Sequence, residues 1–390
     1  MAVGFNRQHF VNSKIQENML HRNNHRGCCD ATPSTQTKAT LKALWELAID
    51  ARMNLKTLSA QLGLSQTTVS RAINGYPEVS EETRARVKAA AELNGYRPSA
   101  AARRLATGQS GTLGMIFPAE RNSLSDLIFT EFLGGCVERA GDLGYDVTLA
   151  TARAGVTEEA VYRRTVRNAR VDAMIISSPL VSDPRPALLQ SLRMPFLIHG
   201  RTQTAEPYAA LDIDNRGAFE AATRLLIDLG HRAIALLNGE RRHNYATDRA
   251  VGYQQALAAK GLWPRPDLIC EAEMREDAGY HQAKDLLSGD APPTAFLCSS
   301  IAQALGAAKA CTDANRRVGR DIALIAHDDR LHDFRAESFD PPLTTTQSSI
   351  GDAGRRIVEL AVGMLQQPDA GLPVEVWPVD LVVRASTPAI

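Results

Sequence analysis

Short apolar runs alternate with helical segments over residues 111–390, and this alternation constrains the fold more than any other feature. The runs have the length and composition of buried strands rather than of buried helices. Strands that alternate with helices form parallel sheets with helices on both faces. We therefore expect an α/β body in which a ligand binds beyond the carboxyl ends of the strands. The expected strands are 112–117, 145–150, 171–177, 195–199, 233–237, 294–298 and 322–326.

Residues 65–74, before this body, predict a capped helix with an unusual polar face. Ser65 can cap its first turn, and Val69, Ala72 and Ile73 form an apolar stripe at helical spacing. The opposite face carries Gln66, Thr67, Ser70, Arg71 and Asn74. Amides, hydroxyls and one guanidinium suit base edges in a major groove, whereas an ordinary solvated face is rich in Glu and Lys.

Two further helical segments flank this one. Residues 55–61 have leucines at spacings of three and four, and Gly63 then breaks the chain. Residues 80–93 start with a Ser80 cap and two acids and end at Asn94-Gly95. Helix, glycine turn and polar helix is the helix-turn-helix arrangement, although structural bundles also use such pairs. The buried side of the third helix is predicted as Val87, Ala90, Ala91 and Leu93.

Short motifs then follow one another in a fixed order. They are TVSRAING at 68–75, NGYRPSAAARRL at 94–105, LGMIFP at 113–118, VDAMII at 171–176, PFLIHGR at 195–201, DIDN at 212–215, LGHRAIA at 229–235, RAVGY at 249–253, PPLTT at 341–345 and LVVRAST at 381–387. This order resembles the LacI/GalR family of bacterial repressors from about Met53 to the C-terminus. HGR at 199–201, with DIDN, most resembles the branch that controls uptake of α-glucosides or related sugars.

The resemblance implies an α/β protein with a three-helix helix-turn-helix head, a hinge helix and a two-lobed periplasmic-binding-protein-like sensor with parallel sheets. Residues 54–98 would form the head, 99–110 the hinge helix and linker, and 111–390 the sensor. The chain would cross three times between the sensor lobes. The expected N-lobe comprises about 111–210 and 347–378, and the expected C-lobe about 211–346 and 379–390.

Residues 1–53 precede the head and show little periodicity before about residue 41. Because Met53 stands directly before the family-like sequence, we expect 1–53 to be an upstream extension, disordered or absent from the native protein. An added basic arm that contacts DNA phosphates is the alternative. An intact mass that includes residues 9–51 would contradict the first interpretation.

By resemblance, a homodimer would place two recognition helices on the half-sites of a near-palindromic operator. Arg71 suits a guanine, and Leu105 would wedge into the minor groove and kink the duplex. No leucine heptad follows Arg384, which favours a dimer over a tetramer. The expected DNA contacts are Thr57, Ser65, Gln66, Thr67, Ser70, Arg71, Asn74 and Leu105.

The resemblance also assigns residues to an effector, expected to be a sugar. Arg249 matches the arginine that grips neighbouring ligand oxygens with its planar fork. Asp328 matches an acid that accepts two sugar hydroxyls, and Asp329 beside it is expected to point away. Ser300 and Met274 stand where relatives often have an asparagine and an aromatic ring, and both changes leave the ligand's identity open.

Three further positions carry two interpretations each. His199 and Arg201 follow a predicted strand and would line the N-lobe side of the cleft, or serve as core and salt-bridged residues. Phe129 would supply an apolar wall, or simply belong to a helix core. The expected effector contacts are Arg249, Asp328, Ser300, Met274, Arg201, His199 and Phe129.

Charge is unevenly distributed along the chain. Residues 54–108 have a net charge of +4 and residues 109–390 have a net negative charge, although the whole chain has 44 basic and 44 acidic side chains. A basic head on an acidic body is typical of a DNA-binding module joined to a sensor. The 6 cysteines include no C-x-x-C pair, so we expect reduced thiols in a cytoplasmic protein without a membrane partner.

Other classes of protein lack support in the sequence. Neither G-x-G-x-x-G nor a P-loop nor G-x-S-x-G occurs, so we expect no enzyme, no catalytic residues and no cofactor. No metal-ligand cluster accompanies Asp328 and Asp329. The remaining alternative is a periplasmic type of sugar-binding protein without a regulatory role, which would need a signal peptide and no DNA-reading head.

Overall fold

The computed structural model describes residues 53–96, 109–117, 126–151, 155–168 and 171–390. The chain divides into two compact units, Met1–Pro98 and Ser99–Ile390. The expected extension over 1–52 and the expected hinge helix before residue 109 lie outside the described ranges.

The first unit contains three short helices around a small core. They are α3 (Leu55–Leu62), α4 (Gln66–Ile73) and α5 (Glu81–Leu93). Each helix begins at a polar capping residue. Ser65 and Ser80, the two predicted caps, and Asn54 each accept a hydrogen bond from the backbone amide three residues later. The shared core consists of Leu58, Val69, Ala72, Val79, Val87 and Ala91. Helix-turn-helix geometry is therefore confirmed.

Leu93 is the exception to the predicted core, because its side chain is 86% exposed. It lies two residues after Ala91, which places it about 200° around the helix from that buried position. The prediction that Leu93 is buried was therefore wrong. Leu93 is the last residue of α5 and lies on the face of the helix opposite the core.

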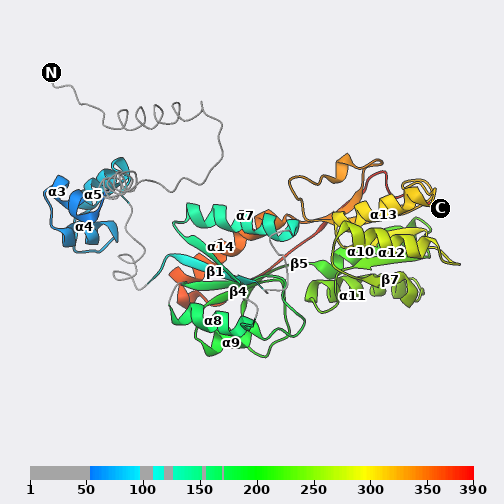
Figure 1. Cartoon of the computed structure of the whole chain (residues 1–390), viewed down its shortest axis with the longest axis horizontal. Coiled ribbons are helices and arrows are strands. Elements are labelled where there is room, and N and C mark those ends of the chain that lie inside the picture. Colours follow the sequence, from blue (N-terminus) through cyan, green and yellow to red (C-terminus); the bar gives the residue numbers. More distant parts are fainter. Residues whose placement is uncertain (1–52, 97–108, 118–125, 152–154, 169–170) are drawn as a thin grey trace, which may run out of the picture. The chain divides into compact units, whose positions relative to one another are not determined.

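The N-lobe of the second unit is built on a fully parallel six-stranded sheet in the order β11-β5-β4-β3-β1-β2. Helices α7 (Leu127–Asp142) and α14 (Ile350–Gln366) cover one face, and α8 (Glu158–Arg167) and α9 (Arg185–Ser191) cover the other (Figure 1). The strands are β1 (Thr112–Phe117), β2 (Asp146–Thr151), β3 (Ala173–Ile176), β4 (Phe196–His199), β5 (Ala209–Ile213) and β11 (Val374–Trp377).

The C-lobe has a second six-stranded sheet, in the order β12-β10-β9-β8-β6-β7, in which only β12 is antiparallel to its neighbour. Its helices are α10 (Asn215–Asp228) and α11 (Asn244–Ala259) on one face, and α12 (Glu276–Leu287) and α13 (Ile301–Asp313) on the other. The strands are β6 (Ile234–Asn238), β7 (Ile269–Glu271), β8 (Ala295–Cys298), β9 (Ala323–Asp328), β10 (Thr344–Gln347) and β12 (Asp380–Val382). Short 3-10 turns are Pro266–Leu268, Ala336–Ser338 and Pro368–Ala370.

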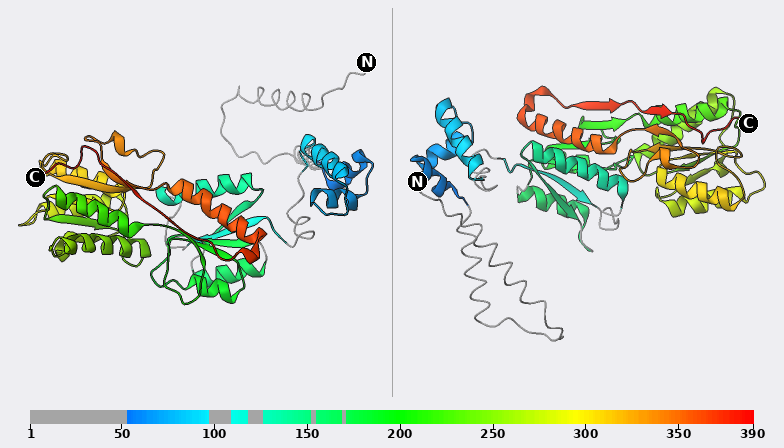
Figure 2. Two further views of the ribbon diagram at one scale, coloured as in Figure 1. Left: turned by 180° about the vertical axis from the view of Figure 1, so that it is seen from behind. Right: turned by 90° about the horizontal axis from the view of Figure 1, so that it is seen from above.

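The chain passes between the two lobes three times. The crossings follow β5, β10 and β11, and Figure 2 shows the red segment with β11 and β12 running from one lobe to the other. All seven predicted strands are present, so the two-lobed α/β architecture is confirmed. The first crossing falls after Ile213 rather than near residue 210, because Ala209–Ile213 pairs with β4 and β11 in the first sheet.

Three helix pairs pack without room for a side chain at their crossing points. A Cβ atom added to Gly135 of α7 would lie 2.1 Å from the carbonyl oxygen of Gly351 on α14, and one added to Gly354 would lie 2.2 Å from that of Phe132. Gly252 meets α10 in the same way, and Gly279 and Gly306 join α12 to α13. Small residues thus let the backbones of paired helices touch, while the sheets contact the helices through larger side chains.

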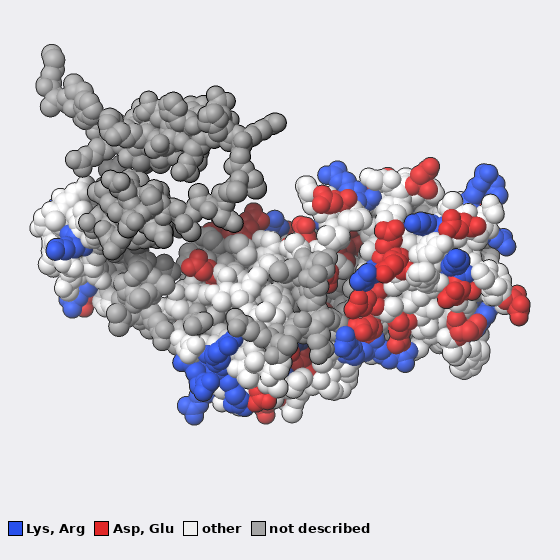
Figure 3. All heavy atoms as spheres, in the orientation of Figure 1, with Lys and Arg blue, Asp and Glu red and all other residues white. Residues whose placement is uncertain are grey.

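Among the described residues, no helix is both long enough and apolar enough to cross a membrane. Four cysteines in these ranges, Cys136, Cys270, Cys298 and Cys311, are free thiols. On the face shown in Figure 3, acidic and basic side chains intermingle over the C-lobe.

Candidate functional site

The outer face of α4 is a polar surface supported by an apolar underside. Gln66, Thr67 and Arg71 are exposed, while Val69 and Ala72 are fully buried beneath them. The buried stripe fixes how the helix lies on the head, so the exposed amide, hydroxyl and guanidinium groups point outward together. These are the functional groups that read base edges in the major groove.

The remaining predicted DNA contacts on the head differ in the hydrogen bonds that their side chains already make. Ser65 is occupied as the cap, accepting from Thr68 N at 3.0 Å. Asn74 is partly buried and donates from its amide nitrogen to the carbonyl oxygen of Ser70 at 2.8 Å, so part of its capacity closes the helix end. Thr57 is exposed and donates to Asn54 Oδ1 at 3.1 Å. Leu105 lies outside the described residues.

Arg249 is the centre of the second candidate site. It is on the first turns of α11, which follows β6, and its side chain is only 4% exposed. Its Nε donates to Asn215 Oδ1 at 2.8 Å, and its Nη1 donates to the carbonyl oxygen of Ser299 at 2.7 Å. The guanidinium carbon lies 4.9 Å from the Phe219 ring centre and 5.1 Å from that of Tyr245. Two hydrogen bonds and two rings therefore fix the plane of the fork.

The third nitrogen of Arg249 is different. Nη2 makes no hydrogen bond to the residues that the structure describes. It is also not completely buried, so a ligand atom could reach it. Burial lowers the pKa of Arg249, and the Asp329 carboxylate opposes that effect. Arg249 thus holds an oriented cation with donor capacity remaining at the carboxyl ends of the C-lobe strands.

Asp328 is the last residue of β9 and is almost fully buried. Its Oδ1 accepts from Arg330 N at 2.7 Å, and its Oδ2 accepts from Gln347 Nε2 at 3.1 Å. Burial raises its pKa, and these bonds oppose the shift. Each oxygen keeps a further lone pair, so Asp328 can still accept a hydroxyl.

Asp329 does not point away from this cluster, which corrects the sequence interpretation. Its carboxylate is 3.6 Å from His327 Nε2, and it opposes the lowering of the pKa of both Arg249 and His199 by burial. Its backbone carbonyl accepts from Ile350 N at the start of α14, which turns the chain at this point. The charge of Asp329 also raises the pKa of Asp328, so the two consecutive carboxylates interact.

The two positions that depart from the relatives, Ser300 and Met274, differ in what they contact. Ser300 is buried and caps α13, its hydroxyl accepting from Gln303 N at 3.2 Å. Met274 is partly buried, with its sulfur 4.0 Å from Arg249 Nη1. Met274 is therefore beside the fork, and the capping bond leaves the Ser300 hydroxyl its proton and one lone pair.

The N-lobe contributes His199 and Arg201, at the end of β4. The His199 ring stacks on Phe132 with centres 4.7 Å apart, and burial lowers its pKa to about 4. Arg201 Nε is 2.8 Å from Asp212 Oδ2 at the end of the neighbouring β5. Burial raises the pKa of Asp212 to about 6, although Arg201 opposes the shift. His199 interacts with Asp329 of the C-lobe, so these groups meet the Arg249 cluster across the lobes.

Phe129 lies in the core of the N-lobe, which is the second of the two roles expected from the sequence. Its ring packs edge-on against Phe117 with centres 4.6 Å apart, and the residue belongs to the core between α7 and the first sheet. The same core contains Phe132, on which His199 stacks.

Sequence reasoning missed four residues of this site. Asn215 and Ser299 bond the Arg249 fork, and Phe219 and Tyr245 flank it. Two signals could have found them: Asn215 and Ser299 follow parallel strands at the carboxyl edge, and Tyr245 stands four residues before Arg249 on one helix.

Direct contacts join the two lobes near this cluster. Val181 N donates to the carbonyl oxygen of Arg242 at 2.9 Å, and Asn244 N donates to that of Pro179 at 3.3 Å. A ring nitrogen of His243 is 3.2 Å from the carbonyl oxygen of Ser178. Since α11 begins at Asn244, an N-lobe loop is bonded to the start of the helix that carries Arg249.

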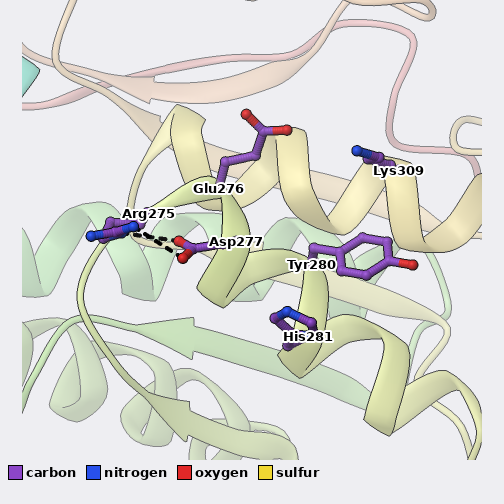
Figure 4. A pocket seen from close by; sticks show the side chains of 6 residues that line it. All are labelled: Arg275, Glu276, Asp277, Tyr280, His281 and Lys309. Carbon is purple, nitrogen blue, oxygen red and sulfur yellow. Dashed lines mark hydrogen bonds and ion pairs between the residues drawn. The ribbon is translucent and has the colours of Figure 1, made fainter.

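A separate groove of about 430 Å³ lies on the surface of the C-lobe between α12 and α13 (Figure 4). Two of its charged groups pair with each other, since Arg275 bonds Asp277 at 3.0 Å, and Lys309 lies over the Tyr280 ring. It contains none of the predicted site residues, which lie at the strand ends instead. Its lining consists of Arg275, Glu276, Asp277, Tyr280, His281 and Lys309.

Comparisons with known proteins cover both units. Residues 58–99 match the family model "Bacterial regulatory proteins, lacI family", and residues 223–387 match a periplasmic binding protein-like domain. The chain is 45% identical over 336 residues to the HTH-type transcriptional regulator AglR of Rhizobium meliloti, covering 86% of this chain and 94% of that protein. It is 36% identical to the regulator RafR of Escherichia coli, covering 71% of this chain and 82% of that protein.

Solved structures give the same result. The transcriptional regulator CelR in complex with cellobiose is 28% identical, with a TM-score of 0.64. The match covers 86% of this chain and 100% of the CelR chain. The lac repressor dimer bound to operator and an anti-inducer is 27% identical with a TM-score of 0.70, covering 86% and 99%. The chain therefore belongs to the lacI family of bacterial regulatory proteins, and it is a DNA-binding transcriptional regulator rather than an enzyme.

Proposed function

We propose that this regulator is a cytoplasmic repressor whose affinity for a near-palindromic operator changes when a sugar binds between its sensor lobes. In this proposal residues 54–98 form the DNA-binding head, 99–110 the hinge and 111–390 the sensor. The observation that carries the effector part is the fixed Arg249 fork, which has a free donor and lies near the carboxylates of Asp329 and Asp212. The complex of CelR with cellobiose supports a sugar in such a cleft.

The proposal assigns contacts to named residues of both sites. Gln66, Thr67 and Arg71 would touch bases, with Thr57, Ser65, Ser70 and Asn74 nearer the backbone and Leu105 in the minor groove. Arg249, Asp328 and Asp329 would hold sugar hydroxyls from the C-lobe, while His199 would approach from the N-lobe. Ser300, Met274 and Arg201 would complete the wall, and Phe129 supports it from the core.

We further propose that the working form is a homodimer. Apolar side chains are exposed on α7 and on the neighbouring edge strand β2, which is unusual for a surface that stays in water. They are Leu127, Val137, Leu143 and Leu149. The lac repressor, which shares this fold, is a dimer on its operator.

Fluorescence anisotropy tests the function directly. A labelled fragment from upstream of the gene is titrated with the full chain at fixed salt, with and without a panel of mono- and disaccharides. Tight binding that one sugar alters would support the proposal, and a half-site should bind far more weakly than the full site. Tight binding that no sugar alters would retain the regulator and reject the sugar.

Replacing Arg71 by alanine should weaken specific operator binding by about 1–3 kcal/mol, because a bidentate contact to a base edge is lost. The exposed guanidinium makes little contribution to the head's own core, so folding should be retained. Anisotropy with cognate and scrambled DNA measures the ratio of affinities. The matched control is Arg86→Ala on α5, and an unchanged ratio for Arg71→Ala would remove its assigned role.

A further inference from the structure

We propose that the N-lobe makes a second contact with DNA, independent of base sequence, through a basic patch on the side of its sheet that α8 and α9 cover. The patch consists of Arg164, Arg167 and Arg193. This contact goes beyond the proposed function, in which only the head and the hinge touch DNA. It adds affinity for a duplex that continues beyond the operator, and it adds no specificity.

The three arginines are brought together by one apolar core. Tyr162 of α8 and Leu189 of α9 pack in the same buried cluster. Arg164 and Arg167 are on the exposed side of α8, and Arg193 follows α9 just before β4. On the face drawn in Figure 3, basic side chains gather over the part of the N-lobe where Figure 1 labels α8 and α9.

The patch is not neutralised by acidic neighbours. The side chains of Arg164, Arg167 and Arg193 are exposed, and they make no hydrogen bond or ion pair with the part of the chain that the structure describes. The carboxylate of Glu159 on the same helix is already paired with Arg163 at 2.7 Å. Three complete guanidinium forks therefore face the solvent in a sensor whose net charge is negative. Such forks match the geometry of phosphate oxygens.

Arg193 occupies a backbone position that does not favour an arginine. Its φ of 53° is in the left-handed region, and it stands one residue beyond Leu192, the C-cap of α9. Glycine and asparagine adopt this conformation most readily at the end of a helix, whereas other side chains are strained there. The dipole of α8 favours cations in its last turn, which accounts for Arg164 and Arg167 but not for Arg193. The charge of Arg193 therefore points to a contact outside the fold.

The patch is at the edge of the sheet where the chain arrives from the DNA-binding head. Between parallel strands each helix returns the chain to the edge where strands start, so α8 and α9 both end at that edge. β1 starts at the same edge, at Thr112. Asp172, just before β3, accepts from the backbone amides of Ser110 and Gly111 at 2.7 Å each. These bonds fix the arriving chain to the strand that follows α8.

This connection favours DNA as the partner over an acidic protein. Only residues 97–108 separate the described parts of the head and the sensor along the chain. DNA that the head binds is therefore presented to the sensor at a high effective concentration, so even a weak contact contributes to affinity. A duplex carries a phosphate about every 1.7 Å along its axis, so the patch needs no particular register.

Fluorescence anisotropy with the full chain tests the contact. A triple variant with alanine at Arg164, Arg167 and Arg193 is compared with the parent on the upstream fragment and on a scrambled duplex of the same length, over a range of salt concentrations. We expect both affinities to fall by the same factor, roughly tenfold at low salt. The slope of log K against log salt should become shallower by about 0.9 for each phosphate contact that is lost. The equal factor distinguishes the patch from Arg71, whose loss should change the ratio of the two affinities.

The matched control removes three exposed arginines from the C-lobe. Alanine at Arg224, Arg316 and Arg317 changes the net charge by the same amount and should leave the affinities and the slope close to those of the parent. Lysine at the three patch positions keeps the charge and should restore the slope. An unchanged slope in the alanine variant of the patch, or an equal loss in the C-lobe control, would overturn the second DNA contact. No sugar is used, so the result is independent of the proposed effector.

Discussion

Replacing Arg249 by alanine should abolish the effector response while operator binding remains. The side chain supplies the free Nη2 donor and the positive charge of the cleft, so we expect effector affinity to fall by at least about a hundredfold. The α4 face is in the other compact unit, and its contacts involve none of the Arg249 partners. Operator anisotropy with increasing effector measures both quantities in one experiment.

The controls separate binding from folding. Alanine at position 249 also leaves Asn215 Oδ1 and the Ser299 carbonyl without their buried donor, which costs about 1–3 kcal/mol for each group. Arg249→Lys keeps the charge but loses the fork, so it should recover stability better than effector affinity. Arg224→Ala on α10 removes an exposed arginine and should change neither. A full effector response in Arg249→Ala would remove the residue from the site.

The direction of the response depends on both lobes. A ligand shifts operator affinity only by its differential affinity for the two states of the sensor. Arg249 bonds the C-lobe residues Asn215 and Ser299, while Asp329 interacts with His199 of the N-lobe. A sugar that contacts Arg249 and His199 together can therefore distinguish one lobe arrangement from another.

The fold could largely be predicted because most strands are apolar and buried. Strand β10 is an exception, because its fully buried residues are polar and form no apolar pattern. They are Thr344, Thr345 and Thr346. Their hydroxyls bond partners far along the chain, such as Arg384. A buried polar strand is recognisable only when its partners are known, so hydrophobic periodicity could not find it.

The site was predictable only in part. The position of Arg249 followed from a motif, but the orientation of Asp329 did not, because adjacent side chains of a regular strand point to opposite faces. β9 ends at Asp328, and the chain then turns at Asp329, whose carbonyl bonds Ile350 N. The turn takes Asp329 out of the regular alternation of the strand, and its carboxylate acts on Arg249 and His199. No local pattern in the sequence reports such a turn.

Alanine at Gly135 should destabilise the sensor, although alanine at the adjacent Gly134 should stabilise it. The Cβ at 135 would lie 2.1 Å from a backbone oxygen of α14, which no change of rotamer can relieve. Overpacking of this kind outweighs the gain in helix propensity, and we expect a net loss of about 3 kcal/mol in the free energy of unfolding. At Gly134 no atom lies within 4 Å, so only the propensity gain of about 0.5–1 kcal/mol remains.

Thermal unfolding of the two variants, followed by circular dichroism, measures this difference. For a sensor of this size, Gly135→Ala should lower Tm by roughly 6–12 °C, and Gly134→Ala should raise it by a few degrees. The two substitutions add the same methyl group at adjacent positions of one helix, so the gain in helix propensity cancels between them. The sign of the difference then reports whether α7 and α14 are in backbone contact. Equal Tm values would mean that the helices can separate without cost, and that close packing does not hold the N-lobe together.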